Sequence, residues 1–179
     1  MKMPSHWTYA GWFTFLRLYT GIFWLSHGVP KFLDAQSFMP PGGFIVMAVQ
    51  KGLTTHHGAY HAFLANVVAP NINLFAELDR LGEVLVGCAL LLGIFTRFAG
   101  LVGCFLSLNY FTLNGGFGHW TSIGSLDAAA FVLSLMFLAV PAGRVVGVDA
   151  LLTRRTVREQ PITPEIVEEP PPSTQAPPR

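Results

Sequence analysis

Four long runs of apolar residues dominate the hydropathy pattern of this 179-residue chain. They cover residues 11–29, 75–96, 98–117 and 123–142. At about 1.5 Å of rise per residue, a helix over any of these runs is roughly as long as the hydrocarbon core of a bilayer is thick. The pattern therefore predicts an all-α protein, an integral membrane four-helix bundle.

The connector between the first and second runs contains shorter apolar segments. Prolines and glycines at 40–43 interrupt the chain, and the apolar stretch 44–49 that follows is too short to span a bilayer. Further along, apolar residues recur at helical spacing over 60–68. Both segments are typical of helices that lie on a membrane surface, so we expect interfacial helices in this first outer loop.

The two ends of the chain differ from the apolar middle. Residues 1–10 form a short arm with Trp7 and Tyr9, residue types favoured at a membrane interface. Residues 153–179 are rich in Pro and Glu and bury too little apolar surface to order themselves. The expected organisation is an N-terminal arm (1–10), a four-helix transmembrane domain (11–152) and a disordered cytoplasmic tail (153–179).

Composition supports the membrane class. Hydrophobic residues make up 51% of the chain and charged residues 12%, against about 25% charged in a soluble domain. The net charge of +1 argues against a nucleic-acid partner. No sequence motif for a phosphate loop, a dinucleotide fold or haem attachment is present, and we expect neither a metal nor a haem.

Basic residues predict the orientation. Arg97 lies in the turn between the second and third runs, and Arg144, Arg154, Arg155 and Arg158 follow the fourth run, whereas the loop 114–124 has no charged residue. Because Lys and Arg accumulate on the cytoplasmic side, we expect a multi-pass protein of the inner membrane with both termini in the cytoplasm.

Polar side chains inside the apolar runs fall at similar depth. Counting from the cytoplasmic ends of the helices at about 1.5 Å per residue places four of them roughly 20–24 Å up. These four are His27, Glu83, Asn109 and Asp127. The layer predicts a polar pocket that faces the outer side and either binds an anion or passes protons to a quinone. Alternatively, its members satisfy one another and hold the bundle together.

Other charged groups at membrane depth add candidates for binding. Lys31 and Arg80, with Glu77 and Asp79, are expected to rim the polar layer. Arg17 lies lower and either contacts backbone carbonyls or binds an anion or quinone. The candidates for catalysis are thus His27, Glu83 and Asp127, and those for substrate or quinone binding are Arg17, Lys31, Arg80, Arg97 and Asn109.

Cys88 and Cys104 are the only cysteines. Each lies eight residues from Thr96, on opposite sides of the turn, so the two share a depth. A redox pair is one interpretation. Close packing of helices through the neighbouring glycines is the other.

The residues also resemble a known family. The strings LRLYTG (16–21) and SHGVPKF (26–32) look like the first helix of DoxX/DoxD membrane proteins. Glu83, Gly87, Gly93 and Arg97 resemble the pattern of the family's second helix, and AGRVVGVD (142–149) its closing segment. The resemblance covers residues 15–152. Arg17, His27, Lys31, Glu83 and Arg97 fall on the family's recurring polar positions.

The resemblance implies a function. The DoxD branch is a subunit of thiosulfate:quinone oxidoreductase, which joins two thiosulfates into tetrathionate and passes the electrons to quinone. It implies quinone as electron acceptor, a small anion as ligand, and a second membrane or periplasmic subunit besides the lipid bilayer. Two alternatives stay open: a non-catalytic scaffold of a respiratory or detoxification complex, and a binder of a lipid-like ligand. The lipid-binding alternative predicts an apolar pocket beside a polar layer whose members form hydrogen bonds and ion pairs with one another.

Overall fold

The computed structural model describes residues 5–118, 120–140 and 147–148. Every regular element among them is helical, which confirms the all-α prediction. The predicted tail 153–179 and the arginines that follow the fourth run lie outside the described residues.

The four apolar runs form the four long helices. The boundaries are α1 (Ser5–Gly28), α6 (Ile72–Leu92), α7 (Thr96–Leu113) and α8 (Leu126–Ala139). Helix α1 begins earlier than its apolar run, so the second half of the predicted N-terminal arm is helical. Across the described ranges, no helix combines enough length with enough apolar character to cross a membrane.

The connector after α1 is helical in short pieces. They are α2 (Pro30–Leu33), α3 (Ala35–Phe38), α4 (Phe44–Thr55), α5 (Gly58–Phe63), the π-helix η1 (Leu64–Val68) and the 3₁₀-helix η2 (Ala69–Asn71). Two 3₁₀-helices, η3 (Gly116–Gly118) and η4 (Trp120–Gly124), join α7 to α8. Hydrogen bonds from Ser37, through its side chain and its backbone N–H, lower the pKa of the exposed Asp34, which caps α3.

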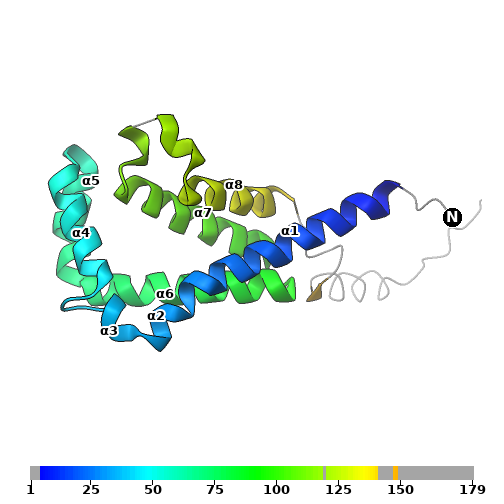
Figure 1. The fold of residues 1–179 in the computed structure, drawn as a ribbon, viewed down its shortest axis with the longest axis horizontal. Helices are drawn as coiled ribbons and strands as arrows, with labels where there is room; N and C mark the ends of the chain where they lie inside the picture. Colours follow the sequence, from blue (N-terminus) through cyan, green and yellow to red (C-terminus); the bar gives the residue numbers. More distant parts are fainter. Residues whose placement is uncertain (1–4, 119, 141–146, 149–179) are drawn as a thin grey trace, which may run out of the picture.

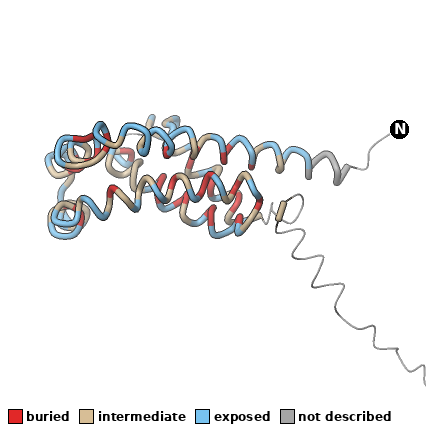
Figure 2. Tube along the Cα trace, turned by 90° about the horizontal axis from the view of Figure 1, so that it is seen from below, coloured by how far each residue is buried: buried red, intermediate tan, exposed pale blue. Residues whose placement is uncertain are grey.

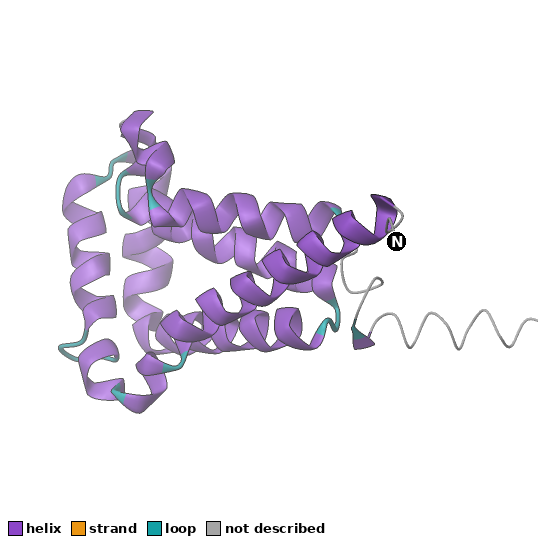
Figure 3. Ribbon diagram, turned by 45° about the vertical axis from the view of Figure 1, so that its right-hand side comes forward, coloured by secondary structure: helices purple, strands orange, loops and turns teal. Residues whose placement is uncertain are grey.

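The long helices pack in a fixed sequence of neighbours. Helix α1 packs on α6, α6 on α7, and α7 on α8, and all four run along the long axis of the molecule (Figure 1). Helices α4 and α5 stand across the end of the bundle farthest from the N-terminus (Figures 1 and 3). Because α4 contacts both α6 and α7, the connector closes that end.

Glycines set the spacing between the long helices. A Cβ atom at Gly21 would come within 3.0 Å of the Gly87 carbonyl oxygen, and one at Gly87 within 2.9 Å of the Gly21 carbonyl oxygen. Helices α1 and α6 therefore touch through their backbones. A Cβ at Gly100 would lie 2.5 Å from the backbone nitrogen of Leu138, so α7 and α8 meet in the same way.

The distribution of side chains is unusual for a folded chain in water. Small and polar residues share the interior with large apolar ones: Thr20, Ala76 and Ser134 are completely buried, and so are Leu90 and Phe137. Large apolar residues stand on the outside at helical spacing, as in the stripe Leu74, Leu78, Leu81, Leu85 and Leu92 of α6. Figure 2 shows the buried positions confined to the inner sides of the helices.

The turn between α6 and α7 follows from local backbone chemistry. Helix α6 ends at Gly93, whose φ of 67° is left-handed and suits glycine. Phe95 next to it also has a positive φ, 48°. A side chain at Gly93 would clash with the guanidinium of Arg17, which is buried against the turn. Arg17 therefore packs on the end of α6.

Candidate functional site

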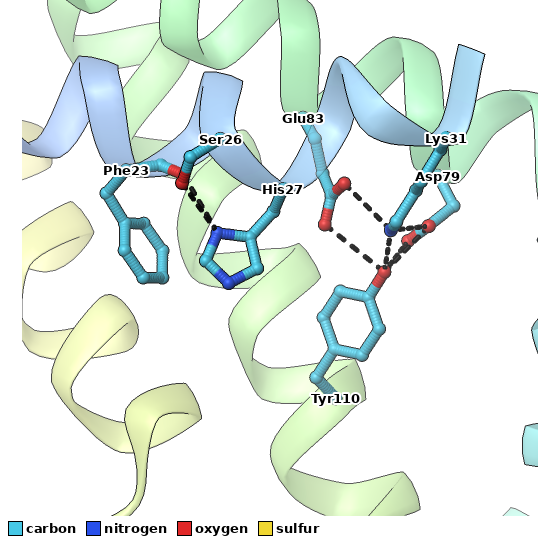
Figure 4. Close-up of polar contacts among 7 residues, drawn as sticks. All are labelled: Phe23, Ser26, His27, Lys31, Asp79, Glu83 and Tyr110. Carbon is cyan, nitrogen blue, oxygen red and sulfur yellow. Dashed lines mark hydrogen bonds and ion pairs between the residues drawn. The ribbon is translucent and has the colours of Figure 1, made fainter. Parts of the chain in front are cut away.

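Four side chains from three helices converge into a buried ionic cluster, made of Lys31, Asp79, Glu83 and Tyr110 (Figure 4). The Lys31 ammonium lies 2.6 Å from Asp79 Oδ2 and 2.7 Å from Glu83 Oε2. It also donates a hydrogen bond of 2.6 Å to the Tyr110 hydroxyl. The side chains of Lys31 and Asp79 are about 15% exposed and that of Glu83 only 2%.

Tyr110 is the common neighbour of both carboxylates. Its hydroxyl lies 2.7 Å from each Asp79 oxygen and 3.2 Å from Glu83 Oε1. A phenol has a single O–H and acceptor lone pairs, so Tyr110 accepts from Lys31 while its own proton serves one carboxylate at a time. The Tyr110 O–H can therefore point to Asp79 or to Glu83 without any movement of the heavy atoms.

Local structure explains why these residues meet. Asp79 and Glu83 are four residues apart on α6 and share one face. Gly28 lies so close to Glu83 and Val84 that a Cβ there would be within 3.0 Å of both. The end of α1 can therefore approach α6, and α2, which begins at Pro30, places Lys31 above the two carboxylates. The rings of Phe38 and Tyr110, 4.6 and 5.1 Å from the ammonium, enclose it.

A cavity of about 230 Å³ adjoins the cluster on one side, and we call it the polar pocket. His27, Lys31, Glu83, Tyr110, Asn114 and Asp127 line it, together with Trp24 and apolar neighbours. Asn114 donates a hydrogen bond of 2.9 Å to Asp127. The indole N–H of Trp24, itself only 2% exposed, has no hydrogen-bond partner.

The tautomer of His27 follows from its contacts. Its Nδ1 lies 2.9 Å from the backbone carbonyl oxygen of Phe23 (Figure 4). A carbonyl oxygen can only accept, so Nδ1 carries the proton and Nε2 of the neutral ring has a free lone pair. His27 thus brings a proton-accepting nitrogen to the polar pocket, whose lining it shares with Glu83.

A second cavity, of about 310 Å³, lies on the other side of the cluster, and we call it the apolar pocket. Its walls come from α4, α5, η1, α6 and α7 and include Phe63, Phe75, Leu78 and Phe105. Asp79, Asn109 and Tyr110 are polar groups in its lining. Burial raises the pKa of Tyr60, another wall residue.

The structure brings together three members of the predicted polar layer. His27, Glu83 and Asp127 line the polar pocket. Asn109 does not join them, because it faces the apolar pocket and donates to the Phe105 carbonyl oxygen. Adjacent residues on a helix point about 100° apart, and it is the next residue, Tyr110, that faces the cluster.

The basic candidates separate. Lys31 and Asp79 both belong to the ionic cluster itself, whereas the sequence placed them on the rim of the polar layer. Arg80 pairs with Glu77 and stacks on the ring of Phe32, 4.4 Å away. Arg97 donates to the carbonyl oxygen of Ala139, and Arg17 packs on Gly93, ten residues or about 15 Å along α6 from Glu83. Arg17 and Arg97 are therefore not part of the cluster.

Cys88 and Cys104 form no disulfide in this structure, and their surroundings differ. Both are free; Cys88 is exposed, whereas Cys104 is buried with its sulfur 3.8 Å from the Phe131 carbonyl oxygen on α8. Among the described residues, no group of three or more His, Cys, Asp or Glu is arranged to hold a metal ion.

The hydropathy pattern did not identify Tyr110 as a site residue. A tyrosine in an apolar helix carries one signal: when it is buried, its hydroxyl needs a partner. The Lys31 and Asp79 partners lie 79 and 31 residues away, so no local pattern could identify them.

Fold and site together define a class: a helical bundle with a buried ionic cluster between a polar and an apolar pocket. The chain belongs to the DoxD family, because the family model described as TQO small subunit DoxD matches residues 12–167. This confirms the resemblance seen in the sequence. The family is one of membrane proteins related to thiosulfate:quinone oxidoreductase. Because DoxD is described as the small subunit of that enzyme, a partner subunit is expected. No curated protein and no solved structure gives a match to the chain.

Proposed function

We propose that this protein is the quinone-reducing membrane subunit of a complex that oxidises thiosulfate to tetrathionate. The observation that carries the proposal is the DoxD match over residues 12–167. The ionic cluster between two pockets agrees with it, since an ionisable network beside an apolar cavity suits the reduction of an apolar electron acceptor.

We assign thiosulfate oxidation to the partner subunit, because the two basic residues expected near the polar layer, Lys31 and Arg80, are already paired. Lys31 contacts two carboxylates and Arg80 pairs with Glu77. Asp127 adds a further carboxyl group to the polar pocket, and Lys31 is the only Lys or Arg that lines it. Ionised carboxylates would repel a dianion. We therefore propose that Lys31 and Arg80 do not serve as ligands for thiosulfate.

Residence in the inner membrane is part of the proposal. Large apolar side chains form outward stripes on the long helices, such as Phe98, Leu101, Phe105 and Leu108 on α7. Apolar surface of this extent marks a contact with lipid or protein. The backbone contacts at Gly21 and Gly87 are the kind that membrane helices use to associate.

A labelling experiment tests membrane residence and orientation. In a background of Cys88→Ser and Cys104→Ser, we expect an impermeant thiol reagent outside the cell to label Thr121→Cys and to leave Ser173→Cys unlabelled. The physical reason is the excess of arginine after the fourth apolar run. Labelling of Ser173→Cys from outside intact cells would show that the orientation is the opposite of the one proposed. Release of the protein into the soluble fraction by alkaline extraction, with both cysteines labelled equally, would show that it does not reside in the membrane.

The activity is tested with membranes that contain this chain with and without its partner subunit. We expect thiosulfate to reduce decylubiquinone only when both are present. If no combination reduces the quinone, the proposed activity is wrong and the scaffold alternative takes its place.

A lipid-like ligand is a second candidate. The apolar pocket and a cluster whose members pair with one another are the two features that this alternative predicts. Native lipids extracted from the purified protein distinguish the two functions: a stoichiometric lipid other than a quinone favours the lipid binder.

A further inference from the structure

The ionic cluster forms the wall between the two pockets. Tyr110 lines both of them, Lys31 and Glu83 line the polar pocket, and Asp79 lines the apolar pocket. The contacts across this wall are all between 2.6 and 3.2 Å. An unbroken set of hydrogen bonds and ion pairs therefore connects the polar pocket to the apolar one.

The apolar pocket fits a flat ring that has oxygen acceptors and an apolar chain. Phe63, Phe75 and Phe105 supply aromatic walls. Leu78 and Phe105 are more than half exposed as well as lining the cavity, which places its mouth on the outer face of α6 and α7. A ligand could thus enter sideways from a lipid phase.

Hydrogen-bond donors are available in the lining of this pocket. The amide of Asn109 has two N–H groups, of which one is bonded to the Phe105 carbonyl oxygen. The other N–H and the hydroxyl of Tyr110 can donate to a ligand oxygen. Ligand pockets are mostly apolar with a few such polar groups.

Chemistry requires a source of protons at this place. Joining two thiosulfates into tetrathionate releases two electrons and no proton, whereas the reduction of a quinone to a quinol takes up two electrons and two protons. Both protons must therefore come from water, whereas the lining of the apolar pocket is mostly apolar.

We propose that the apolar pocket receives the quinone ring and that Tyr110 delivers protons to it from the polar pocket. This inference rests on the proposed function, which supplies the electron pair from thiosulfate. The O–H bond of Tyr110 breaks toward the ligand oxygen, and Lys31 Nζ gives its proton to the Tyr110 oxygen. A proton from water in the polar pocket is taken up by the lone pair of His27 Nε2, passes to a carboxylate oxygen of Glu83 and restores the Lys31 ammonium. Two passes deliver two protons and return every group to its starting state.

Binding of the quinone is measured first, on the purified full chain, by quenching of tryptophan fluorescence with decylubiquinone. We expect Asn109→Ala to weaken binding about five- to tenfold, the equivalent of one hydrogen bond. Asn71→Ala is the matched control, since Asn71 also donates to the carbonyl oxygen four residues before it but lies outside both pockets. Equal binding by both variants, or no binding by the wild type, overturns the assignment of the pocket.

Proton delivery is measured on the complex with its partner subunit. Thiosulfate is the electron donor, and two electron acceptors are compared. Decylubiquinone needs protons, and ferricyanide takes electrons alone. We expect Tyr110→Phe to slow quinone reduction at least 100-fold, in the range for loss of a positioned proton donor. Its dissociation constant for decylubiquinone should rise no more than about tenfold, the loss of one hydrogen bond, and its ferricyanide rate should stay within threefold. Tyr19→Phe, which removes a hydroxyl from the outer face of α1, should change none of the three.

The outcomes separate the two proposals. If ferricyanide and quinone reduction fall together in Tyr110→Phe, or neither falls, Tyr110 is not the proton donor. If the wild-type complex oxidises thiosulfate with neither acceptor, the proposed function is wrong and the proton role falls with it, while the fluorescence titration of Asn109→Ala still decides where the quinone binds.

Discussion

Replacing Lys31 by methionine should lower the free energy of unfolding by about 3–5 kcal/mol, because it leaves buried carboxylates without their cation. Glu83 is 2% exposed and Asp79 14%, so water solvates these carboxylates far less well than the ammonium does. The Tyr110 hydroxyl would lose the group that donates to it. Chemical or thermal unfolding of the detergent-solubilised protein measures the change.

Two further variants make this test specific to the cluster. Lys51→Met removes an exposed lysine and should change stability by no more than about 0.5 kcal/mol. Adding Glu83→Gln to Lys31→Met should restore part of the lost stability, since it removes one of the two uncompensated charges. If Lys31→Met unfolds like Lys51→Met, the cluster does not stabilise the fold.

Replacing Gly100 by valine should destabilise the bundle by about 3 kcal/mol, at the upper end for overpacking. A Cβ there would lie 2.5 Å from the backbone nitrogen of Leu138 and 2.8 Å from the Ser134 carbonyl oxygen. Both atoms belong to the backbone of α8 and cannot rotate away as a side chain can. Helices α7 and α8 would have to move apart.

Gly11→Val is the matched control, since a Cβ at Gly11 meets nothing within 4 Å. We expect it to be neutral or slightly stabilising, because glycine is a poor helix former. The same unfolding measurement compares the two. Equal stability of the two variants would mean that the backbones of α7 and α8 are not in contact at Gly100.

Some of the site was predictable because depth along a helix is a local quantity. The rise per residue is fixed, and the turn at Gly93 is short, so counting residues from it gives the depth of Glu83. The same counting placed His27 and Asp127 at that level, and the structure brings all three to the polar pocket.

Rotation about the helix axis was not predictable in the same way. Asn109 and Tyr110 have almost the same depth, yet one faces the apolar pocket and the other the cluster. Cys88 and Cys104 share a depth, yet one is exposed and the other buried. Which face of a helix turns inward depends on how its neighbours pack, through contacts such as that of Gly100 with α8.

The sequence by itself determined the four long helices, a tight turn between the second and third of them, the family and the level of the polar groups, because these depend on residue order and on repeating backbone geometry. Only the turn's place moved: it lies at 93–95, and Arg97 belongs to α7. Only the tertiary structure decided that Lys31 pairs with Asp79 and Glu83 and that Tyr110 joins them between two pockets. Those partners are far apart in the chain, and the packing of α1, α6 and α7 brings them together.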